Sequence, residues 1–261
     1  MIKINNKNIK ISLPSYIIPG TYYENILFIN EKLDFIDNIE LLFYFIDDET
    51  FELFKKEFAG VVYFNNRFEY SFHLPDDIIS NFKNIEKLLN FVYNLKKSNF
   101  IIHSPDLKKN GFENNLNHFY VFFEKYFNLK DKFNSYNFLI ENFVERDFSF
   151  INKDRFKNEN ICFDLGHIYK RNEIPENFIL KNNIKIERIK EIHFHGLYNG
   201  KDHSIFDYIF LRDNFENLKS FFKILLQNIE NDLIINIEVF SLEEFNILYR
   251  LLLKLLDKLN F

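Results

Sequence analysis

Residues that could do chemistry are concentrated between Ile189 and Ile205, which read IKEIHFHGLYNGKDHSI. A short apolar run ends in His193 and His195, and a loop then leads to the adjacent Asp202 and His203. Side chains two apart on a strand point to the same face, so we expect His193 and His195 on one side. Imidazole and carboxylate donors gathered in this way are typical of a site for Zn, Mn or Fe. One histidine alone would more often be an ordinary polar loop residue, but four donors in one window predict a metal site.

Further candidate ligands end apolar runs elsewhere in the chain. They are His73 in SFHLPDD, His103 in IIHSPD, Glu141 in FLIEN, Asp164 and His167 in ICFDLGHIY, and Glu238 in IINIE. A buried strand carboxylate is costly unless it is paired or bound to a metal, so Glu141 and Glu238 are strong candidates. We expect Gly166 to allow a tight turn that brings His167 back over the same site. The alternatives are glutamates that lie in solvent beyond shorter strands, and an Asp164 that only caps a helix beside a surface His167.

The elements that must position these donors alternate between short apolar runs and longer segments of helical period. Strands are expected at 9–13, 39–45, 68–73, 100–103, 137–142, 161–165, 189–195 and 233–240, and helices at 22–32, 50–58, 79–97, 112–127 and from Ser241, where Glu244 completes a capping box. This alternation predicts an α/β fold with parallel strands. The 261 residues suit one (β/α)8 barrel domain over 1–261. A doubly wound sheet is the alternative, but it would gather its site at one switch point, whereas here six consecutive strands end in potential ligands.

Composition and charge exclude several classes of protein. No apolar run reaches the ~18 residues of a membrane span, and the start, MIKINNKNIKI, has no apolar core of a signal peptide. The single cysteine, Cys162, cannot form an internal disulfide and is expected in the core, which fits a cytoplasmic protein without membrane partners. The net charge of −5 argues against a nucleic-acid partner.

With these residues in view, the sequence resembles the xylose isomerase-like barrels, which include sugar isomerases, sugar epimerases and metal phosphodiesterases of the endonuclease IV type. The resemblance implies that the metal set shared by that superfamily is Glu141, Asp164, His193 and Glu238. It also implies further ligands of the endonuclease IV type at His73, His103, His167, Asp202 and His203. In that type one residue separates the last Asp and His, whereas here they are adjacent. Three phrases, FHLPDD, IHFHGLYNGKDHSIF and EVFS, resemble the cobamide-remodelling phosphodiesterases, which cut the nucleotide loop of cobalamin-type corrinoids.

The resemblance implies metal-dependent hydrolysis of a phosphodiester in a small-molecule substrate, with a corrinoid as the substrate that the three phrases indicate. Two or more divalent ions, Zn, Mn or Fe, are expected. The expected catalytic residues are Glu141, Glu238, Asp202 and His203, and the expected substrate contacts are His195, Lys201 and Tyr16. Other tyrosines that could line an apolar mouth are Tyr22, Tyr23, Tyr169 and Tyr198.

Three other functions remain open at this point. A sugar isomerase or epimerase would need one divalent metal and two acid–base carboxylates, which Glu141 and Glu238 could supply. An endonuclease IV-like DNA repair enzyme would need basic loops that reach into a groove. A barrel without chemistry would bind a ligand or a protein partner and show no turnover.

Overall fold

Eight parallel strands form a closed ring, as the sequence predicts. The computed structural model describes residues 1–4, 7–105, 112–144, 146–230 and 232–259. The ring consists of β2 (Lys7–Pro14), β3 (Asn38–Leu42), β4 (Glu69–His73), β5 (Lys97–His103), β6 (Phe138–Glu141), β7 (Asn160–Asp164), β8 (Ile189–His193) and β11 (Leu233–Asn236). Each strand pairs with its neighbour, and pairing of β2 with β3 and with β11 closes the circle. The (β/α)8 barrel is therefore confirmed.

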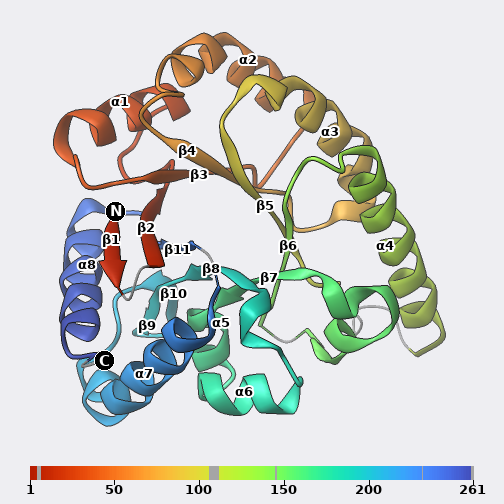
Figure 1. Ribbon diagram of the computed structural model, residues 1–261. Helices are drawn as coiled ribbons and strands as arrows, with labels where there is room; N and C mark the ends of the chain where they lie inside the picture. The colour runs from red at the N-terminus through yellow and green to blue at the C-terminus, as the bar shows by residue number, and fades with distance from the viewer. Residues whose placement is uncertain (5–6, 106–111, 145, 231, 260–261) are drawn as a thin grey trace.

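Helices surround this ring on the outside (Figure 1). They are α1 (Tyr22–Lys32), α2 (Asp48–Tyr63), α3 (Ile78–Phe91), α4 (Phe112–Lys132), α5 (Leu165–Lys170), α6 (Pro175–Lys181), α7 (Tyr208–Asn228) and α8 (Leu242–Asp257), with 3-10 turns at Val92–Asn94, Ser149–Asn152, Asp154–Asn158 and Ile186–Arg188. Local signals fix their ends: Thr21 and Glu24 form a capping box at α1, and Ser241 accepts from the Glu244 amide at α8. Among the described residues, no helix is both long and apolar enough to cross a membrane.

Several boundaries differ from the sequence prediction. The helix expected to reach residue 97 ends at Phe91, because Lys97 already pairs in β5. The final barrel strand ends at Asn236, so Glu238 lies beyond it. Two hairpins were not predicted: β1 (Ile2–Ile4) pairs with β2, and β9 (Gly196–Tyr198) pairs with β10 (Lys201–Ser204). Asn199 and Gly200 have positive φ angles of 53° and 75° and form the turn of the second hairpin, a role typical of an Asn-Gly pair.

A small apolar cluster lies beneath three of the candidate ligands, among buried polar side chains such as Asn99 and Glu191. Ile101, Leu139 and Cys162 form a small buried cluster separate from the main core. Each lies two residues before a candidate ligand, namely His103, Glu141 and Asp164, and i and i+2 side chains share a face of a strand. These three candidate ligands therefore lie just beyond the cluster, at the carboxyl ends of the strands, where barrel enzymes carry their sites.

Candidate metal centre

The structure brings all nine predicted ligands together at the carboxyl-terminal end of the ring. They are His73, His103, Glu141, Asp164, His167, His193, Asp202, His203 and Glu238, and each has a ligand atom within 4 Å of another member of the set. Apart from His103, these donors and their neighbours fall into overlapping groups of three or four whose ligand atoms lie within 4.8 Å of one another.

The first group consists of Glu141 with His73 and His193, and His103 also contacts Glu141. The Oε2 atom of Glu141 lies 3.2 Å from Nε2 of His73 and 3.1 Å from Nε2 of His103. Its Oε1 atom lies 3.2 Å from Nδ1 of His193. Burial favours the neutral acid, but His193 and His103 outweigh it and hold the pKa of Glu141 well below its usual range. Both oxygens of this carboxylate therefore lie among potential ligands, which allows it to hold one cation or to bridge two.

His103 is held from its other side by Asp76, which lies in the PDD turn after β4. Nδ1 of His103 is 2.8 Å from Oδ1 of Asp76, and Arg146 donates to the same oxygen at 2.6 Å. Burial lowers the pKa of His103, but Glu141 and Asp76 together raise it to about 9. An outer carboxylate of this kind fixes which ring nitrogen points to a ligand position, so part of the FHLPDD phrase has a structural role.

A second group consists of Glu141, Asp164, His193 and Glu238, which are all buried. Nδ1 of His193 lies 3.0 Å from Oε2 of Glu238 and 3.6 Å from Oδ2 of Asp164. Asp164 also caps α5, because its Oδ1 accepts from the His167 amide at 2.6 Å. The helix-capping alternative is thus correct for Asp164 without removing it from the cluster, and His167 is buried rather than on the surface.

The third group consists of His167, His195, Asp202 and His203. Asp202 and His203 lie on β10, so the hairpin delivers them to the barrel mouth. Nδ1 of His195 is 3.5 Å from Oδ1 of Asp202, and the rings of His195 and His203 stack with centroids 4.3 Å apart. His195, expected as a substrate contact, thus lies among potential ligands, while His193 belongs to the second group.

The expected role of Gly166 was wrong. This residue lies inside α5, where its φ is not positive, so it makes no tight turn. A Cβ atom at this position would lie 1.9 Å from Cε1 of His195. Glycine is needed here because the His195 ring packs directly against the helix backbone.

The chemistry of these donors fits divalent metal ions. The ligand atoms are imidazole nitrogens and carboxylate oxygens, the mixture that Zn, Mn and Fe accept. Oε2 of Glu141 and Oε2 of Glu238 are buried without a well-aligned hydrogen bond among the described residues. Their nearest neighbours are histidine nitrogens at 3.0–3.4 Å, contacts that suit either protonated imidazoles or a shared cation.

Sequence reasoning missed two buried carboxylates beneath the centre. Glu40 on β3 lies with Oε2 3.0 Å from Nε2 of His193. Glu191 on β8 accepts hydrogen bonds from Ser71 and Asn99, and burial and the nearby Glu40 raise its pKa to about 8. The signal was present in both cases, because NIELL and IKEIH place a carboxylate inside an apolar run, the criterion that selected Glu141.

The expected substrate contacts are only partly at the mouth. Tyr22 and Tyr169 are buried in the core, and Tyr23 packs against Gly60 of α2, so these three do not line it. Tyr16 is half-exposed and its ring lies 5.6 Å from that of Tyr22. Lys201 is exposed on β10, and the lysine that contacts Asp202 is Lys170, at 2.8 Å.

Two other aromatic residues lie beside the ligands. The rings of Tyr44 and His73 are 6.3 Å apart, those of Tyr44 and Phe240 are 6.4 Å apart, and those of Phe240 and His203 are 5.5 Å apart. Tyr44 is 45% exposed and Phe240 is 37% exposed. Burial of the hydroxyl and the nearby Glu238 raise the pKa of Tyr44, so it remains a neutral donor. These rings cross the mouth between the first and third donor groups.

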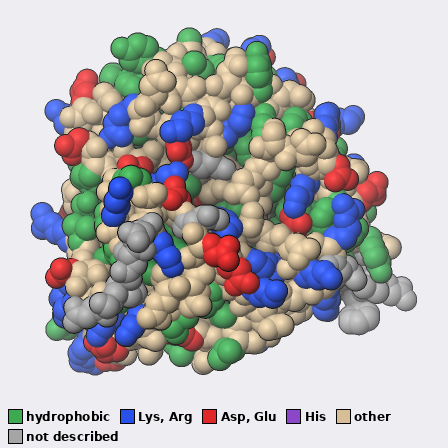
Figure 2. Space-filling model, viewed as in Figure 1, with side chains coloured by type: hydrophobic (Ala, Val, Ile, Leu, Met, Phe, Trp, Pro, Cys, Tyr) green, Lys and Arg blue, Asp and Glu red, His purple; other side chains and the backbone are tan. Residues whose placement is uncertain are grey.

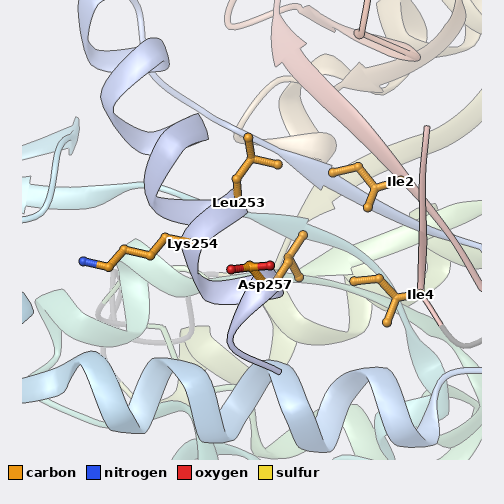
Figure 3. Close-up of a pocket in the computed structure, with 6 residues that line it drawn as sticks. Ile2, Ile4, Leu253, Lys254 and Asp257 are labelled. Atoms are coloured by element: carbon orange, nitrogen blue, oxygen red, sulfur yellow. The ribbon is translucent and has the colours of Figure 1, made fainter. Parts of the chain in front are cut away.

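A hollow in the surface lies away from the candidate ligands. It has a volume of about 600 Å³ and is lined by Ile2, Ile4, Leu253, Lys254, Leu256 and Asp257. Figure 3 shows these side chains between β1 and the last turns of α8. That region belongs to the amino-terminal end of the barrel, because β1 pairs with the first half of β2. The hollow contains none of the candidate ligands and is not part of the site.

Comparison with known proteins places the fold. No protein-family model and no curated protein matches the chain. Among solved structures, a D-tagatose 3-epimerase-like protein is 20% identical, with a TM-score of 0.66, over 96% of this chain and 98% of its own. The IolI protein with a bound zinc atom is 10% identical, with a TM-score of 0.66, over 96% and 99%. A family 2 AP endonuclease from Brucella melitensis is 13% identical, with a TM-score of 0.54, over 90% and 94%.

Because each of the three is 20% identical to this chain or less, these likenesses bear on the fold alone. None of the three is described as acting on a corrinoid, so they give no support to the cobamide-remodelling resemblance. Together with the closed ring of parallel strands, they establish that this chain has the (β/α)8 barrel fold of these proteins.

Proposed function

We propose that the chain is a metal-dependent phosphodiesterase whose centre holds at least two divalent ions. The observation that carries this proposal is the position of Glu141, whose Oε2 lies 3.1–3.2 Å from His103 and His73 and whose Oε1 lies 3.2 Å from His193. Cations held there would neutralise the charge of a bound phosphate and activate water for attack, as in two-metal hydrolases. His73 and His103 would complete one cation position, and Asp164, His193 and Glu238 the neighbouring one.

The remaining donors extend the centre toward solvent. Asp202 and His203 are partly exposed, unlike the buried Glu141 and Glu238. Oε2 of Glu238 lies 3.4 Å from Nδ1 of His203, which links the two regions. In this position Asp202 and His203 can ligate a further cation or orient the attacking water, and Lys170, 2.8 Å from Asp202, can offset phosphate charge.

The substrate that we propose is a phosphodiester with a large apolar group, and the nucleotide loop of a cobamide is the specific candidate. The exposed rings of Tyr44 and Phe240 between two donor groups support an apolar substrate face. The phrases FHLPDD, IHFHGLYNGKDHSIF and EVFS support the corrinoid itself. Figure 2 shows acidic and basic side chains interspersed on the face it presents, without the basic stripe that a DNA-binding surface would carry.

A sugar isomerase or epimerase is the second candidate, and the solved structures favour it. The group of Glu141, Asp164, His193 and Glu238 would suffice to hold its one metal, and the two glutamates would act as the general acid and base. That reaction has no need of His103 with its Asp76 partner, or of the His167, Asp202 and His203 set. The presence of these extra donors at contact distance is why we place the phosphodiesterase first.

Two assays on one preparation separate these functions. Purified protein loaded with Zn, Mn or Fe is incubated with cobalamin and pseudocobalamin and analysed for released cobinamide products, and in parallel with bis(p-nitrophenyl) phosphate. The same protein is incubated with ketohexoses and analysed for epimers. Cleavage of either phosphodiester supports the proposal. Epimerisation without phosphodiester cleavage selects the second candidate, and cleavage of the aryl ester with intact corrinoid removes only the specific substrate.

A further inference from the structure

We propose that Glu40 is a positioning residue of the candidate metal centre, which accepts the Nε2–H of His193 and thereby presents Nδ1 of that ring to the cation. This inference rests on the metal centre of the proposed function but not on the reaction that the centre catalyses. Glu40 contacts Nε2 of His193, the nitrogen that does not face Glu141 and Glu238, so it would act through His193 rather than bind substrate. A ligand atom of Glu40 also lies within 4.8 Å of those of His73 and Glu238.

The two nitrogens of His193 have different surroundings. Nδ1 lies 3.0 Å from Glu238 and 3.2 Å from Glu141. Nε2 lies 3.0 Å from Oε2 of Glu40. A neutral imidazole carries one proton, so a ring that ligates through Nδ1 must keep its proton on Nε2. A buried carboxylate is the strongest available acceptor for that proton, and such partners fix the tautomer and orientation of metal-bound histidines.

The carboxylate is rigidly placed for this role. Glu40 and His193 are both 0% exposed and come from β3 and β8, which are not neighbours in the ring. The strand under Glu40 is fixed by pairing with β2 and β4, and the carbonyl of Glu40 accepts from the Ser15 amide at 2.8 Å. The Oε1 atom of Glu40 has no hydrogen bond among the described residues, so His193 is the contact that this side chain serves.

The nearby Glu191 offers a matched control. It is also fully buried and lies on β8, two residues before His193, but its side chain is hydrogen-bonded by Ser71 and Asn99. Its ligand atom lies within 4.8 Å of those of Glu40 and His193, so these three could instead form a cation site of their own. Under that alternative Glu191 would matter as much as Glu40, whereas under our proposal it would not.

The test measures Zn²⁺ affinity by competition with a chromophoric chelator, and metal stoichiometry at saturation, for wild type, Glu40→Gln, Glu40→Leu and Glu191→Gln. A glutamine can still accept the Nε2–H, and a leucine cannot. We expect Glu40→Leu to bind one zinc about 10- to 100-fold more weakly with unchanged stoichiometry. Glu40→Gln should recover most of that loss, and Glu191→Gln should resemble wild type. Circular dichroism of each metal-free variant checks that it is folded.

Three results would overturn the inference. Wild-type affinity in a folded Glu40→Leu protein would show that His193 needs no partner. Equal losses in Glu40→Gln and Glu40→Leu would deny the hydrogen-bond role. Loss of one whole metal in Glu40→Gln and Glu191→Gln alike would make these carboxylates ligands. Zinc affinity is measured without turnover, so the two proposals can fail separately. Zinc binding without cleavage of any phosphodiester would contradict the proposed function but not this inference.

Discussion

Oε2 of Glu141 lies 3.1 Å from Nε2 of His103 inside the barrel mouth. His103 is the last residue of β5, and Glu141 is the last residue of β6. The neighbouring strands place these residues opposite one another in register. This pairing distinguishes the proposed centre from a single-metal site, because His103 lies outside the four-donor group that one cation would need. The predictions below follow from that distinction.

Glu141→Gln should disrupt two cation positions at once. The variant keeps the size of the side chain but removes the charge that balances His73, His103 and His193. We expect metal affinity to fall by more than the ~10- to 100-fold typical of an outer-partner change, with phosphodiesterase activity lost in parallel. Elemental analysis and a chelator titration measure the effect, and Glu159→Gln, which alters a buried glutamate paired with Lys130, is the control. Loss of a single metal with the other bound normally would deny the bridging role.

Asp76→Asn should weaken one cation position and spare the other. Asp76 contacts His103 at 2.8 Å and none of the Asp164, His193 and Glu238 set. The expected result is a fall of about 10- to 100-fold in the affinity of one metal only. Titration with two resolved binding steps is the measurement. Parallel weakening of both steps would mean that the positions are not separable.

Gly166→Ala tests the third donor group. The added methyl would lie 1.9 Å from the His195 ring, so the ring must move away from Asp202 and His203. We expect a loss of stability of about 1–3 kcal/mol from overpacking, with reduced metal content. Gly200→Ala is the matched control, because its φ of 75° strains the hairpin while nothing lies within 4 Å of the new atom. A metal content that falls equally in both variants would show that the ring contact is unimportant.

Metal binding should strengthen as pH rises toward 9. In the metal-free protein Glu141 and Asp76 raise the pKa of His103 to about 9, and Glu238 raises that of His203 to about 9. Their protonated forms stabilise the metal-free fold below about pH 6.5, and this contribution is lost as pH rises through 9. Cations compete with these protons, so apparent affinity should rise by up to about tenfold per pH unit for each proton displaced. Calorimetric titrations at pH 6 to 9 in buffers of different ionisation enthalpy measure the apparent metal affinity and the number of protons displaced. An affinity that does not change with pH would contradict the prediction.

Phe240→Ala and Tyr44→Ala should affect large substrates more than small ones. Both rings are partly exposed beside His73 or His203. Removal of a stacking ring costs roughly 1–3 kcal/mol per stacked group, so KM for a corrinoid should rise about tenfold or more while that for bis(p-nitrophenyl) phosphate changes little. Equal changes for both substrates would place the rings in the structure of the centre rather than in substrate binding.

The sequence predicted the barrel and the nine candidate ligands because both depend on local pattern. Alternating apolar runs located the strands, and polar residues at their ends located the site, since parallel strands bring those ends together. It did not predict the β9–β10 hairpin, although Asn199-Gly200 is a strong turn signal, because strand lengths of three and four residues leave little periodicity.

Other features depended on contacts between distant residues. Glu40 and His193 are 153 positions apart, and nothing local in NIELL indicates which residue that carboxylate meets. Gly166 needs to be glycine because of His195, 29 positions away, and not because of its own backbone angles. Relationships of this kind come from closure of the ring and could only be seen in three dimensions.

The most direct test of the central claim is the number of metal ions per chain. Anomalous scattering from crystals grown with Zn²⁺ would both count the ions and locate them. The proposal predicts at least two, with Glu141 in contact with both. The proposal would be contradicted by a single ion held by Glu141, Asp164, His193 and Glu238, with His103 in contact with protein atoms only. That result would favour the isomerase alternative.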